Sequence, residues 1–141
     1  MKKIIYIALL VFFLATIFFS CKSSFPTAGT LVECNGKLLT PTLNPTKRPE
    51  FDGGKQAMFE FFRTNLTPPQ NVANSEIKGK IRVAFVVTKE GEICDVRITS
   101  KPRESLDKEV IRVIKIMPKW IPGIHKGKIV DSYVLLDFAL K

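Results

Sequence analysis

Residues 79–99 read GKIRVAFVVTKEGEICDVRIT, and this stretch decides the fold of the chain. Every second residue from Ile81 to Val87 is apolar, which predicts a strand with one strongly apolar face. The turn at 89–92 is followed by a second alternating run over 93–99, so the two runs predict an antiparallel hairpin. Ile93 falls on the polar side of its alternation, which indicates a twist or bulge near the turn.

Two amphipathic helices flank this hairpin in the sequence. Apolar residues recur at i, i+3 and i+4 over residues 54–66 and again over 105–117, which gives each helix one apolar face. Asp52 is the expected N-cap or first-turn anion of the first helix, and Ser105 is the expected N-cap of the second. The proline that follows each segment predicts its end.

A last alternating run over residues 129–140 predicts a third strand, after a loop marked by Pro122, Gly123 and Gly127. The expected order is therefore α-β-β-α-β. Each helix and the sheet has one apolar face to bury. The predicted fold is an α+β two-layer sandwich, with two helices packed on a three-stranded antiparallel sheet.

The first twenty residues read MKKIIYIALLVFFLATIFFS, and they predict an export signal because two lysines precede an apolar run. The run is shorter than the ~20 residues that span a bilayer comfortably. The segment Phe18-Phe19-Ser20-Cys21 resembles the lipobox of bacterial lipoproteins. That resemblance implies cleavage before Cys21 and acylation of this cysteine. The alternative is an uncleaved membrane anchor.

The chain of 141 residues is long enough for one domain, which excludes large barrels and doubly wound enzymes. We expect three parts: residues 1–20 form a lipoprotein signal peptide or membrane anchor, 21–50 a Pro-containing tether, and 51–141 the domain. Asn35-Gly36 stands between two short apolar-containing runs in the tether, which predicts a short hairpin there.

Cys34 and Cys94 remain as a pair if Cys21 carries lipid. Exported proteins meet oxidising conditions, so one hypothesis is a Cys34–Cys94 disulfide, and the alternative is two free, partly buried thiols. No metal site or cofactor is expected, because the sequence has no C-x-x-C motif and His125 is its only histidine.

The formal net charge is +9, from 22 Lys+Arg against 13 Asp+Glu. Lys115, Lys119, Lys126 and Lys128 gather around the end of the second helix and the following loop. Export makes nucleic acid an unsuitable partner, so these lysines suit anionic lipid or an acidic receptor surface. We expect no enzyme, since His125 has no triad partners and no phosphate-binding loop is present.

Several joints of the predicted fold carry distinctive residues. These are 49–54 (PEFDGG), 79–87, 90–96, 106–110, 117–123 (MPKWIPG) and 136–140. Over about residues 49–140 the chain resembles the C-terminal domain of TonB energy-transducing proteins, most closely the version of Bacteroidetes-type bacteria. The stretch 117–123, after the Leu106-Asp107 helix start, is the most specific part. Pro68-Pro69 departs from the Tyr-Pro pair that is usual in the family.

The resemblance implies that the domain binds the plug-exposed peptide of an outer-membrane receptor, by adding it as a strand beside its own last strand. The candidate strand comprises Ile129, Val130, Asp131, Ser132, Tyr133, Val134, Leu135, Leu136, Asp137 and Phe138. The alternatives for this edge are an ordinary sheet edge and a homodimer contact.

We expect a membrane-anchored, periplasmic TonB-like binding module of the cell envelope that assists TonB-dependent transport. One alternative is an inner-membrane energy transducer. Residues 4–19 contain no His or charged residue of the kind that couples to a membrane motor, and the tether is short for a transducer. The other alternative is a structural envelope lipoprotein that self-associates through the same edge.

Overall fold

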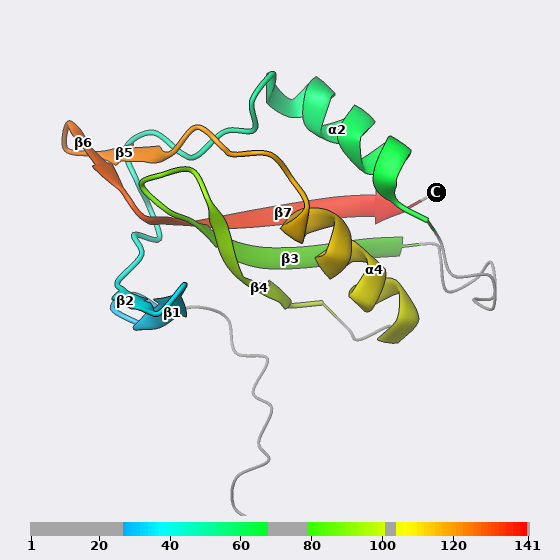
Figure 1. Ribbon diagram of the computed structural model, residues 1–141, viewed down its shortest axis with the longest axis horizontal. Helices are drawn as coiled ribbons and strands as arrows, with labels where there is room; N and C mark the ends of the chain where they lie inside the picture. The colour runs from blue at the N-terminus through cyan, green and yellow to red at the C-terminus, as the bar shows by residue number, and fades with distance from the viewer. Residues whose placement is uncertain (1–26, 68–78, 101–103, 141) are drawn as a thin grey trace, which may run out of the picture.

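The computed structural model describes residues 27–67, 79–100 and 104–140 (Figure 1). The elements are β1 Val32–Cys34, β2 Lys37–Leu39, α2 Gly54–Asn65, β3 Gly79–Val87, β4 Ile93–Ile98, α4 Glu104–Lys115, β5 Gly123–His125, β6 Lys128–Val130 and β7 Ser132–Leu140. This part of the chain is α+β with two helices and antiparallel strands, as predicted. The expected lipidation site Cys21 lies outside the described residues.

The main sheet has the strand order β4-β3-β7, so β3 is central and β7 lies at one side. Both neighbours run antiparallel to β3, and Val83 pairs with Ile98 of β4 and with Leu136 of β7. The predicted hairpin over residues 79–99 is therefore confirmed. Its two strands bring the alternating apolar residues of both runs onto a common surface.

A β-bulge interrupts the pairing of β3 with β4. Ala84 pairs with Arg97 and Val86 with Cys94, so two residues of β4 stand opposite Phe85 alone. Asp95 is the extra residue of the bulge, and its φ is 51°. An extra residue reverses the alternation. Consequently Ile93 packs with the residues beyond the bulge in the main core, and Cys94 lies on the opposite face.

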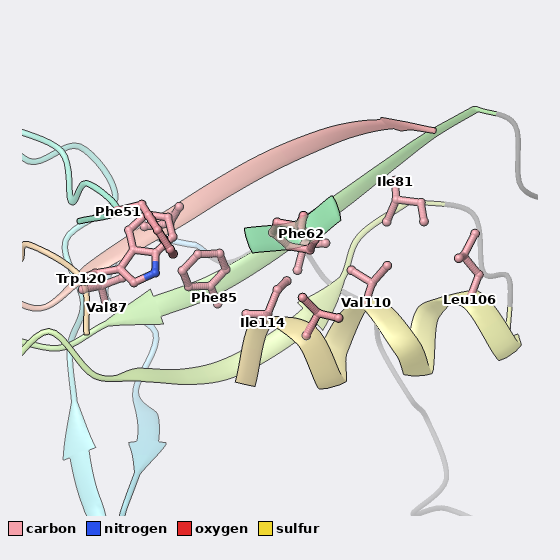
Figure 2. Packing of buried hydrophobic residues seen from close by; sticks show 12 residues of the cluster. Phe51, Phe62, Ile81, Phe85, Val87, Leu106, Val110, Ile114 and Trp120 are labelled. Atoms are coloured by element: carbon pink, nitrogen blue, oxygen red, sulfur yellow. The ribbon is translucent and has the colours of Figure 1, made fainter. Parts of the chain in front are cut away.

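The main core lies between the helices and one face of the sheet (Figure 2). Its buried members are Phe51, Phe62, Ile81, Val83, Phe85, Val87, Leu106, Val110, Val113, Ile114, Trp120 and Val134. Trp120 is 5% exposed and meets Phe85 and Phe51 edge-on, with ring centroids 5.2 and 5.8 Å apart. Such aromatic pairs add to the stability that burial alone provides. Trp120 is therefore a core residue that closes one end of the sheet.

The helix starts differ from the prediction. The N-cap of α2 is Gly53, with no side-chain cap, so the expectation that Asp52 caps this helix is wrong. The amide of Gly54 donates to the carbonyl of Phe51, and this turn separates Asp52 from the first helical amides. Helix α4 begins at Glu104, which places Ser105 inside its first turn.

An ion pair on α4 ties the two helices together. The Arg112 guanidinium donates to both carboxylate oxygens of Glu109 at 2.8 and 2.6 Å, and also to the carbonyl of Asn65 at 2.7 Å. The amide of Thr67 donates to Glu109 at 2.8 Å. These hydrogen bonds, first from Arg112 and then from Thr67, lower the pKa of Glu109 from 4.5 to about 2.

The low pKa of Glu109 predicts an acid-sensitive contribution to stability. The contribution is complete above pH 4.5, declines as the pH falls below it, and is lost below a pH of about 2. We expect Glu109→Gln to be less stable than wild type at pH 7 and to lose less stability between pH 5 and pH 2. Urea unfolding at both pH values measures this. Parallel losses in wild type and variant would contradict the assignment, and Glu60→Gln, at an exposed pair, is the control.

The hairpin β1–β2 covers part of the sheet face that is opposite the helices. Val32 and Cys34 pack there with Val86 and Tyr133, and all four side chains are buried. A disulfide joins Cys34 to Cys94, with their Cα atoms 5.7 Å apart. This cover explains why Val86 is buried although it points away from the strongly apolar face of β3.

The chain after this hairpin stays against the domain. Lys47 and Glu50 pair antiparallel with Ile124 and Ile121, through N–O distances of 2.8–3.0 Å. Residues 21–50 were expected to form a tether with a short hairpin. The hairpin is present, and from Val32 onward the described chain packs on the domain rather than standing apart from it.

The segment before β7 also differs from the prediction. Residues 123–130 form the hairpin β5–β6, in which Gly123, Ile124 and His125 pair with Val130, Ile129 and Lys128, where the sequence predicted a loop and the start of a strand. The expectation of one continuous strand over 129–140 is therefore wrong. Lys126 and Gly127 at φ 50 and 75 allow the chain to reverse in two residues.

Candidate functional site

Strand β7 offers an outer edge that is only partly occupied. On one side it pairs with β3 over its whole length. On the other side, within the described residues, only Thr42 pairs with it, through a parallel bridge at Ser132. The amide of Thr42 donates to the carbonyl of Asp131 at 2.8 Å, and the amide of Tyr133 donates to the carbonyl of Thr42 at 3.1 Å. This bridge closes the start of the strand.

The direction of the remaining backbone groups follows from this bridge. The Tyr133 amide points away from β3, and backbone directions alternate along a strand, so the N–H and C=O groups of Leu135, Asp137 and Ala139 also point outward. A second observation agrees: the carbonyl of Arg82, opposite Asp137, accepts from Thr99 on the β4 side. We call the stretch from Leu135 to Ala139 the open edge.

The side chains of the open edge are apolar and charged in turn. Leu135 is 43% exposed. Asp137 accepts two hydrogen bonds from the Arg82 guanidinium of β3, at 2.7 and 3.0 Å, which lowers the pKa of Asp137. Asp137 and Arg82 also line a shallow depression of about 140 Å³ with Lys80, Thr99 and Ser100. A strand added here would meet one apolar contact and one bidentate ion pair on this face.

The ten residues predicted for partner binding do not all lie on this edge. Ile129 and Val130 belong to β6, and Asp131 joins the two strands, whereas Ser132 to Phe138 lie on β7. Ser132 and Tyr133 are buried, and Thr42 occupies their outer side. Ala139 belongs to the open edge although the predicted binding residues end at Phe138. The alternating pattern of the strand continues through Ala139 to Leu140, and this signal could have added Ala139 to the predicted residues.

Metal-binding groups and membrane-spanning helices are both absent from the described residues. No group of three His, Cys, Asp or Glu side chains there could hold a metal ion. None of the helices in those residues combines the length and apolar character that crossing a membrane requires.

An antiparallel sheet backed by two helices, with one outer strand open, defines a domain that can bind an extended peptide as an additional strand. The family model described as Gram-negative bacterial TonB protein C-terminal matches residues 64–140, and the chain belongs to this family. The predicted membership is thereby confirmed. TonB C-terminal domains are non-enzymatic modules of the Gram-negative cell envelope that interact with TonB-dependent receptors. No curated protein matches the chain.

Proposed function

We propose that this protein is a membrane-anchored TonB-like binding module on the periplasmic side of the envelope, which assists TonB-dependent transport across the outer membrane. It captures the plug-exposed peptide of a receptor by strand addition to the open edge. The observation that carries the proposal is the row of outward-pointing backbone groups at Leu135, Asp137 and Ala139, beyond the Thr42 bridge.

The anchoring part of the proposal concerns the start of the chain. Acylation of Cys21 after removal of residues 1–20 leaves a lipid-anchored chain. An inner-membrane transducer would instead keep Met1 and its apolar segment. The intact mass of the N-terminal peptide from the native envelope separates the two, because a diacyl or triacyl Cys21 excludes coupling through a membrane motor.

Proline substitutions test the open edge directly. Leu135→Pro removes an outward N–H that β3 does not use, and proline is tolerated on an edge strand at such a position. We expect this variant to keep its fold and to lose binding of synthetic receptor plug peptides by at least about tenfold, since two or more backbone hydrogen bonds depend on the local geometry. Calorimetric titration measures the binding, and circular dichroism checks the fold.

Two controls make this result specific. Leu135→Ala keeps the N–H and should lose much less binding than Leu135→Pro. Leu136→Pro removes an amide that faces β3 and should destabilise the whole domain. Unchanged peptide affinity in a folded Leu135→Pro protein would refute binding at the open edge. Concentration-dependent dimerisation that Leu135→Pro abolishes, without any peptide binding, would favour a self-associating envelope lipoprotein.

A further inference from the structure

Two stretches of the sequence contain basic residues and no acid. One runs over residues 34–49, between Glu33 and Glu50, and the other over 110–130, between Glu109 and Asp131. Their basic residues are Lys37, Lys47, Arg48, Arg112, Lys115, Lys119, Lys126 and Lys128. The two stretches lie far apart in the chain, so only the fold can decide whether their charges act together.

The structure joins the two stretches at the hairpin β5–β6. The backbones of Lys47 and Ile124 exchange two hydrogen bonds of 2.9 Å, and the amide of Lys126 donates to the hydroxyl of Thr46 at 3.3 Å. The side chains of Lys47, Arg48, Lys126 and Lys128 are all exposed there. We call these four cations and the hairpin β5–β6 the basic end. In Figure 1 it projects beyond the start of β7, far from the C-terminus.

The basic end is distinguished by the number of exposed cations that it gathers without an ion pair. Elsewhere in the described chain the lysines that do not pair are spread over β2, α2, β3 and α4, and other cations pair with nearby carboxylates, as in Arg63–Glu60, Arg82–Asp137, Lys89–Asp131, Arg97–Asp95, Arg112–Glu109 and Lys119–Glu92. Within the described residues no such pair reaches the four cations of the basic end. Two acids are near in the chain: Glu50 lies two residues after Arg48 but forms no ion pair with it, and Asp131 accepts a hydrogen bond from the amide of Lys89 at 2.9 Å. Positive charge therefore accumulates at this end.

Apolar side chains accompany these charges. Ile124 stands directly opposite Ile129 in the hairpin, and Lys47 stands opposite Ile124 on the other side, so the three side chains share one face. Ile129 is 54% exposed. Branched apolar side chains beside unpaired cations suit the boundary between lipid headgroups and acyl chains.

We propose that the basic end docks on anionic lipid headgroups of the membrane that anchors the protein. The proposed anchoring supplies proximity: Thr27, the first described residue, lies six residues after Cys21, which is a reach of about 20 Å at most. Charge complementarity supplies the selectivity for anionic headgroups. Docking uses a surface distinct from the open edge, so a receptor peptide and the membrane can be bound at once.

Amine labelling of the full chain tests this docking. The protein is mixed with vesicles of phosphatidylglycerol or of phosphatidylcholine and treated with an amine-reactive acetylating reagent, and mass spectrometry follows each lysine. We expect labelling of Lys126 and Lys128 to slow several-fold on phosphatidylglycerol at low salt and to recover near 1 M salt, where the screening length falls to about 3 Å. Lys55 on α2 serves as the internal reference, since it is exposed and is not part of the basic end.

Charge variants make the test quantitative. Each basic side chain near an anionic surface contributes about a fivefold factor to binding. The double variant Lys47→Gln/Arg48→Gln should therefore lower the ratio of docked to undocked protein by about 25-fold, read at Lys126 and Lys128. The matched variant Arg63→Gln/Lys80→Gln removes the same charge outside the basic end, keeps the Lys55 reference, and should leave that protection in place.

The outcomes separate docking from anchoring. Chain that stays in the supernatant with phosphatidylcholine vesicles refutes the anchor, and the labelling pattern with phosphatidylglycerol vesicles still reports on docking. Equal labelling of Lys126 and Lys128 on both lipids at low salt overturns the proposal. Protection by soluble polyglutamate with none from phosphatidylglycerol overturns it too, and assigns the surface to an acidic protein segment.

Discussion

Replacement of both Cys34 and Cys94 by alanine lowers the free energy of unfolding by about 4 kcal/mol. The disulfide links residues separated by 60 positions, and a cross-link of that span removes about 4 kcal/mol worth of conformational entropy from the unfolded chain. Guanidinium unfolding of the oxidised wild type and the double variant measures the difference. Such a loss is a large share of the 5–15 kcal/mol that typically stabilises a domain.

The loss has a local consequence as well. Without the disulfide, β1–β2 is held mainly by the contacts of Val32 with Val86 and Tyr133, and an isolated two-stranded hairpin is marginal in water. We expect proteases to cut residues 27–40 much faster in the double variant. Leu38→Ala is the control, because Leu38 is 70% exposed and its loss should change stability by less than about 0.5 kcal/mol. A double variant within about 1 kcal/mol of wild type would contradict the role of the bond.

The second large effect is expected at Gly91. Its φ of 81° lies in the left-handed region, where any residue other than glycine is strained. A Cβ at this position would also overlap the backbone carbonyl of Trp120. Gly91 also accepts a hydrogen bond from the Trp120 amide at 2.9 Å, so the contact joins the β3–β4 turn to the core-closing tryptophan. We expect Gly91→Ala to destabilise the domain by about 3–4 kcal/mol, by adding steric overlap to backbone strain.

Gly127→Ala is the matched control for this prediction. Gly127 has nearly the same φ, 75, but a Cβ there meets nothing within 4 Å. The control should therefore lose only the strain, about 1–2 kcal/mol. Equal losses at both positions, measured by thermal or denaturant unfolding, would show that contact with Trp120 adds nothing. A near-ultraviolet circular dichroism change in Gly91→Ala alone would locate the disturbance at the Trp120 ring.

Local patterns predicted most of the domain. The alternation from Ile81 to Val87 correctly placed β3 and its core face, and the misplaced Ile93 correctly indicated the bulge that Asp95 occupies. The spacing of apolar residues located both helices to within two residues. These features depend on the periodicity of a strand or helix, which a single sequence carries in full.

Features that depend on distant pairing were not predictable in the same way. The strands β5 and β6 have three residues each, and Lys126-Gly127 is a weaker turn signal than Asn-Gly, so periodicity could not reveal that hairpin. No local pattern indicates that Thr42 pairs beside Ser132 and shortens the open edge. The sequence allowed either a Cys34–Cys94 disulfide or two free thiols. It could not decide between them, because the sequence alone does not show that the bulge turns Cys94 toward Cys34.

The bulge and the disulfide together set how a mechanical pull travels through an anchored chain. Tension that enters from the N-terminus passes at Cys34 through a covalent bond into Cys94 of β4, and then sideways through β3 to β7. The force would reach a peptide bound to β7 through the backbone hydrogen bonds between the strands. Residues 35–50 would not carry this force. The strand β2 therefore lies outside the path of the force, whereas β1 carries it as far as Cys34.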